Sequence, residues 1–137
     1  MTYRPLIKGW QLYFKEKDGY NNRKRILEVL VNFLNDESRK IVKLPGYCQL
    51  GGKIYGHEKF TDGEFILTLE IAYIVREGAI LAAITPYGKR YYFRPDEDEM
   101  NSFMRRMVND CKNGAINSKR WFYLPPRMMK QKDRSFL

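Results

Sequence analysis

Hydrophobic residues follow two different periods in the first third of the chain. Residues 7–15 (IKGWQLYFK) alternate roughly between apolar and polar side chains and are rich in aromatics, which predicts a strand. Residues 23–35 carry apolar side chains three and four positions apart, which predicts a helix over 24–34. Asn21 or Asn22 is expected to cap this helix. The β-branched residues of the segment leave a strand open as the alternative.

Short apolar runs separated by glycines dominate residues 48–93. They predict strands over 49–55, 64–75, 79–85 and 90–93. The breaks between the runs are short, and Asp62-Gly63 and Pro86-Tyr87-Gly88 have the composition of tight turns. Strands joined in this way predict an antiparallel meander that curls around one core.

A second helix is predicted over 99–111. Its apolar stripe at helical spacing consists of Met100, Phe103, Met104, Met107, Val108 and Cys111. Asp96 and Glu99 resemble a capping pair at the start of this helix, and Gly114 would end it. We therefore expect an α+β fold, in which a small curled antiparallel sheet of about five strands packs against two helices. Residues 1–124 form one predicted domain, and residues 125–137, which open with two prolines, form a basic tail.

The charge distribution points to a class of partner. The chain has a net charge of +9. Residues 1–48 carry ten basic and five acidic side chains, and residues 115–137 carry six basic and one acidic. Basic ends of this kind attract nucleic acid or an acidic protein surface. A general bias toward solubility is the alternative explanation.

The sequence also suggests where the protein resides. No apolar run reaches the length of a membrane span, and the first ten residues lack the apolar core of a signal peptide. Cys48 and Cys111 lie far apart and match no zinc-ligand spacing. We therefore expect a soluble cytoplasmic protein with reduced thiols and no membrane partner.

The single histidine, His57, raises the question of catalysis. It lies near Glu58 and Asp62, so it would serve as a general base if a nucleophile were close, but no nucleophile motif is present. A metal site would need further ligands at a suitable spacing, and Gly51-Gly52-Lys53 does not have the spacing of a phosphate-binding loop. The better-supported prediction is structural: residues 56–63 form a bend in which His57 bonds the loop backbone, and Gly51 and Gly52 permit a bulge or a tight bend.

Two segments resemble a known group of proteins. The run GKIYGHEKFTDGEFILT at 52–68 and the run AITPYGKRYYF at 83–93 are similar to small uncharacterised proteins of gut bacteria and their phages. These share a Gly-His-x-x-Phe-x-Asp-Gly bend and a Thr-x-x-Gly-x-x-Tyr hairpin. The resemblance covers residues 49–93, about a third of the chain. It implies a small β module carried by phages or mobile elements, and it implies no chemistry.

Together these observations predict a non-catalytic protein that binds nucleic acid or a nucleoprotein complex, with no cofactor and no metal. The alternative is a counter-defence protein, similar to an anti-CRISPR inhibitor, that docks on a host defence nuclease; a small enzyme using His57 is third. The residues predicted to contact the partner are Arg23, Lys24, Arg25, Lys119, Arg120, Trp121, Tyr123, Arg127, Lys130, Lys132 and Arg134. For the helical basic residues a solvated helix face is the alternative, and for the last segment it is a terminal strand with a frayed tail.

Overall fold

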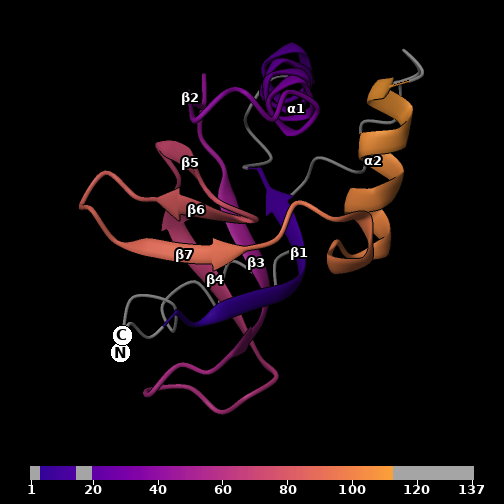
Figure 1. The fold of residues 1–137 in the computed structure, drawn as a ribbon. Coiled ribbons are helices and arrows are strands. Elements are labelled where there is room, and N and C mark those ends of the chain that lie inside the picture. The colour runs from indigo at the N-terminus through magenta and orange to yellow at the C-terminus, as the bar shows by residue number, and fades with distance from the viewer. Residues whose placement is uncertain (1–3, 15–19, 113–137) are drawn as a thin grey trace.

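A computed structural model of the chain describes residues 4–14 and 20–112 and confirms the predicted α+β fold (Figure 1). The helices are α1 (Tyr20–Leu34) and α2 (Ser102–Lys112), and a short 3-10 turn, η1 (Glu97–Glu99), precedes α2. The strands are β1 (Leu6–Tyr13), β2 (Ile41–Lys43), β3 (Gln49–Tyr55), β4 (Glu64–Glu70), β5 (Tyr73–Glu77), β6 (Ile80–Ile84) and β7 (Arg90–Phe93). Within the described residues, neither helix has the length and apolar character that crossing a membrane requires.

The seven strands form one sheet in the order β2-β5-β6-β7-β1-β3-β4. The sequence predicted about five antiparallel strands in a meander. Two strands were missed in that count, because β2 has only three residues and the predicted strand 64–75 is in fact β4 and β5. The predicted meander is correct for β3 and β4 and for β5, β6 and β7, which pair in antiparallel order. It is interrupted between β4 and β5, which are not neighbours, and β1 lies between β7 and β3 and pairs with β7 in parallel.

The step between β4 and β5 produces the predicted curl of the sheet. The Ile71 N–H donates to Cys48 O at 2.9 Å, so this residue still follows the path of β3. The next N–H, that of Ala72, donates to Ile84 O at 2.9 Å on β6. The chain therefore leaves the edge strand β4 and joins β5, next to the opposite edge, within one residue, and the sheet bends around its core.

A β-bulge in β1 sets which side chains face that core. Lys8 pairs with Lys53 and Gln11 with Gly51, so Gly9 and Trp10 together oppose Gly52 alone. Gly9 adopts a φ of 61°, a value that favours glycine. Before the bulge the odd-numbered Ile7 points inward; after it the even-numbered residues do, and Trp10, Leu12 and Phe14 are all buried.

Trp10 joins three elements from its position after the bulge. Its indole N–H donates to Arg94 O at 2.7 Å, and its ring meets Phe93 edge-on with 4.7 Å between centroids. Its carbonyl accepts the Asn101 N–H at 3.1 Å. Trp10 thus fixes the end of β7 through its buried indole and the start of α2 through its backbone carbonyl.

Helix α1 covers the core and is fixed at its C-terminal end by Arg76 of β5. An Arg76 Nη2–H donates to Phe33 O at 2.6 Å, and the guanidinium lies 4.6 Å from the centroid of the Phe33 ring. A cation at this end also offsets the negative pole of the helix. The helix begins at Tyr20, so Asn21 and Asn22, one of which was predicted to cap it, lie in its first turn, and their side chains are outside the described part of the structure.

Helix α2 begins later than predicted. Its cap is Asn101, whose Oδ1 accepts the Met104 N–H at 2.8 Å and whose side-chain amide donates to Gln11 of β1. Asp96 makes no side-chain capping bond, and the acidic residues form η1 instead. Met104, Met107 and Val108 are buried as predicted, whereas Phe103, at the edge of the stripe, is 53% exposed. Gly114 and the side chain of Cys111 lie outside the described residues.

Gly52 is expected to be intolerant of any side chain. A Cβ there would lie 2.6 Å from Ile7 Cγ2 and 2.8 Å from Lys8 O, and the latter is backbone that cannot move without distorting β1. Gly52→Ala should therefore lower the free energy of unfolding by about 1–3 kcal/mol, measured by urea denaturation. The neighbouring exposed substitution Lys53→Ala is the control and should stay within about 0.5 kcal/mol of wild type. Equal denaturation midpoints for the two variants would contradict this account of the bulge.

Candidate functional site

The glycine-rich bend between β3 and β4 is held by one side-chain and one backbone hydrogen bond. The Gly56 N–H donates to Asp62 Oδ1 at 2.7 Å, and the Gly63 N–H donates to Ile54 O at 2.8 Å. Gly56 and Gly63 have φ values of 78° and 87°, which favour glycine. The predicted role of the Asp62-Gly63 pair as a turn is confirmed.

His57 takes part in this bend as predicted. Its Nδ1 accepts the Lys59 N–H at 3.0 Å, and its ring meets Phe60 edge-on with 4.8 Å between centroids. Because Nδ1 is the acceptor, the neutral ring carries its proton on Nε2. Burial lowers the pKa of His57; Glu58 opposes this shift, while Lys59 and Lys89 add to it.

The geometry separates His57 from the cysteine that the structure describes. Cys48 is buried next to the first residue of β3, and His57 lies two residues after the end of that strand. At about 3.3 Å per residue, a seven-residue strand places them roughly 20 Å apart, too far for a catalytic pair. Among the residues that the structure describes, no group of three or more His, Cys, Asp or Glu side chains is arranged to hold a metal ion.

A small pocket lies beside the bend. It has a volume of about 120 Å³ and is lined by Pro5, Ile54, His57, Lys89, Arg90 and Tyr91. Ile54 and Tyr91 are buried, whereas Lys89 and Arg90 are exposed. The pocket therefore has a largely buried floor and a rim of nitrogen-bearing side chains.

The residues predicted to contact a partner differ in burial, and only those on α1 are described by the structure. Arg23 is buried, with 2% of its surface exposed, so it does not share the exposed surface of α1 that the prediction required. Lys24 is half-buried and its Nζ lies 3.8 Å from Glu28 Oε1, while Arg25 is exposed. The remaining predicted contacts, Lys119, Arg120, Trp121, Tyr123, Arg127, Lys130, Lys132 and Arg134, lie outside the described residues.

The structure instead brings basic and aromatic side chains together on the outer surface of the sheet, the surface opposite the buried Ile7, Ile54 and Phe93. The strand register places Leu6 beside Tyr55 of β3 on one side and beside Tyr92 of β7 on the other. We call this surface the basic face and define it by Arg4, Lys8, Lys53, Tyr55, Arg90 and Tyr92. Sequence reasoning missed it because the signal, Lys8 and Lys53 in outward positions of two strands, has meaning only when the strands are known to pair.

Each tyrosine of the basic face has a cation against its ring. Lys8 Nζ lies 5.2 Å from the Tyr55 centroid, and Arg4 Cζ lies 5.4 Å from the Tyr92 centroid. Lys8 and Lys53 are direct cross-strand partners, and neither has an ion-pair partner within residues 4–14 and 20–112. Like charges placed opposite each other in a sheet are destabilising, so the charges of Lys8 and Lys53 do not stabilise this strand pair.

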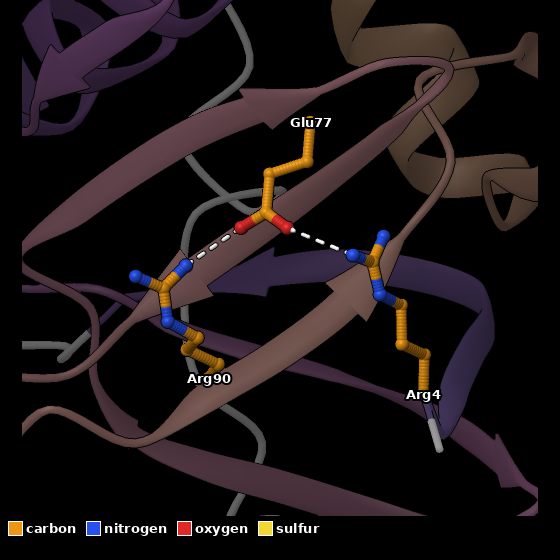
Figure 2. A network of polar contacts seen from close by, with 3 residues as sticks. All are labelled: Arg4, Glu77 and Arg90. Atoms are coloured by element: carbon orange, nitrogen blue, oxygen red, sulfur yellow. Dashed lines mark hydrogen bonds and ion pairs between the residues drawn. The ribbon is translucent and has the colours of Figure 1, made fainter. Parts of the chain in front are cut away.

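One carboxylate organises the arginines of the basic face. Glu77 Oε2 lies 2.6 Å from Arg90 Nη1, and Glu77 Oε1 lies 3.5 Å from Arg4 Nη2. Figure 2 shows Glu77 between the two guanidinium groups. A single negative charge is shared by two cations, so the group keeps an excess positive charge while the arginine side chains are held in fixed positions.

Comparison of the chain with protein families, with curated proteins and with solved structures finds no match. The assignment of a function therefore depends on the geometry of the basic face and of the pocket beside the bend.

The lowered pKa of His57 predicts a bend that is sensitive to acid. The unfolded chain takes up the imidazole proton near the ordinary pKa of 6.5, whereas the folded protein takes it up only at lower pH. The stability contributed by neutral His57 is thus complete above pH 6.5 and is lost as the pH falls through the folded-state pKa. Between about pH 8 and about pH 5, wild type should lose more free energy of unfolding than His57→Ala. Equal losses in the two proteins would contradict the role given to His57.

Proposed function

We propose that the protein binds single-stranded nucleic acid on the basic face. The observation that supports this most strongly is the pairing of Lys8 with Lys53 beside a row of two tyrosines. A polyanion would offset the repulsion between the lysines, and its counterions would be released on binding.

The tyrosines favour a single strand over a duplex. Tyr55 and Tyr92 flank Leu6 on neighbouring strands, so the strand spacing places them about 10 Å apart on one surface. Aromatic rings presented next to cations form the stacking platform on which unpaired bases are held. Bases inside a duplex are already stacked and do not present their faces to such a platform.

The charge balance of this surface supports the same proposal. Four of the residues that define the basic face are cations, and Glu77 is engaged by two of them. Phosphate groups would contact Lys8 and Lys53 directly, while Arg4 and Arg90 keep their positions through Glu77. The predicted basic tail would add to this field, but its placement is outside the described residues.

Lys8→Glu is expected to separate binding from folding. The substitution puts a carboxylate opposite Lys53, so the free energy of unfolding should stay level or rise by about 0.2–1 kcal/mol. Affinity for a single-stranded oligonucleotide at low salt should nevertheless fall by at least about tenfold, measured by fluorescence anisotropy. The slope of log affinity against log salt should become shallower by about 0.7 for each phosphate that the variant no longer neutralises.

Arg25→Glu on α1 is the matched control, because Arg25 is exposed but lies away from the basic face. It should leave the affinity close to that of wild type. Weaker binding by Arg25→Glu and unchanged binding by Lys8→Glu would move the site to α1. If wild type binds neither DNA nor RNA strands at low salt, the proposal is wrong; a host protein retained from nuclease-treated lysate would then favour the counter-defence alternative.

A further inference from the structure

The pocket beside the bend lies at the end of the sheet, and its floor residues Ile54 and Tyr91 belong to the core side, opposite the basic face. Arg90 belongs to both, and Pro5 of the pocket adjoins Arg4 of the face. The pocket is bounded by the residue before β1, the end of β3 and its following bend, and the start of β7. A strand lying along the basic face would therefore reach the pocket by passing around the end of β1 and the start of β7.

The size of the pocket limits what enters it. A volume of about 120 Å³ is well below the size of typical pockets for whole metabolites. A small group such as a single tetrahedral oxyanion suits a space of this size.

The rim of the pocket offers hydrogen-bond donors of three kinds. His57 offers Nε2–H, because its Nδ1 is occupied by the Lys59 N–H. Lys89 is exposed and has no ion-pair partner among the residues described. Arg90 uses Nη1 for Glu77, which leaves further N–H groups of its planar guanidinium for another acceptor (Figure 2).

The surrounding charges favour an anion with more than one negative charge. The positive charges of Lys59 and Lys89 both lower the pKa of His57, and the carboxylate of Glu58 raises it. Burial raises the pKa of Tyr91, so its phenol remains neutral in the pocket wall. Glu77 engages Arg90 from the neighbouring strands but is itself shared with Arg4. A phosphate monoester, with a charge near −2 and three acceptor oxygens, matches this set of donors.

We propose that the pocket formed by His57, Lys89 and Arg90 binds a phosphate monoester. The most direct source is the terminal phosphate of a strand held on the basic face; that source depends on the proposed function, whereas the pocket itself does not. A free phosphate compound has the same chemistry and is distinguished by the experiment.

The sole histidine gives the test a single reporter. With labelled imidazole, the His57 signal is followed by NMR as inorganic phosphate is added, and then as 5′-phosphorylated and 5′-hydroxyl oligonucleotides of one sequence are added. Inorganic phosphate should shift the signal and raise the pKa of His57. The 5′-phosphorylated strand should bind about tenfold more tightly than its 5′-hydroxyl counterpart.

Two variants make the result specific. Lys89→Gln should remove most of the response to phosphate, whereas Lys43→Gln, an exposed substitution on edge strand β2, should keep it. Lys8→Glu should weaken binding of both oligonucleotides yet leave the response to inorganic phosphate, so failure of the basic face and failure of the pocket are distinguishable.

Each outcome decides the proposal. A response to phosphate together with a preference for the phosphorylated strand supports a strand-end site. A response to phosphate without that preference supports a site for a free phosphate compound. No response of His57 to phosphate or to either strand, or an equal response in wild type and Lys89→Gln, overturns the proposal.

Discussion

The β-bulge at Gly9 and Trp10 is the constraint on which both surfaces of the sheet depend. One extra residue in β1 reverses the alternation of the strand, so Ile7 and Trp10 both point inward. The same irregularity leaves Lys8 outward, opposite Lys53. It is possible only because Gly9 accepts a positive φ and Gly52 has no Cβ to meet the β1 backbone. The core and the basic face therefore arise from a single local feature.

Local sequence signals predicted those elements well that depend on interactions between residues close together in the chain. The spacing of apolar residues identified both helices, and the glycine breaks located β3 and β7 at their observed bounds. Long-range pairing escaped this reasoning: the parallel contact of β1 with β7 joins residues far apart in the chain. The break within 64–75 was missed because its residues change sheet partners without any change in composition.

The residues of the site could also be predicted from the sequence only where their signal is local. The bend around His57 was recognisable, since glycine and Asp-Gly composition is a local signal. The helical cluster was less well predicted, because no local pattern distinguishes the buried Arg23 from the exposed Arg25. The basic face had no signal of its own in the sequence, as its residues come from β1, β3, β7 and the segment before β1. The repulsion between the two lysines that lie opposite each other on the basic face disfavours folding. This cost is the physical argument for the proposal that a polyanion binds there.

Mapping of backbone amide chemical shifts during titration with a single-stranded oligonucleotide tests the central claim most directly. If the bulge presents a nucleic-acid surface, perturbed amides should cluster on β1, β3 and β7 around Lys8, Lys53 and Tyr92. The amides of α1, on the other side of the core, should stay unchanged. Perturbations confined to the helices, or none at oligonucleotide concentrations that saturate basic proteins at low salt, would contradict the account.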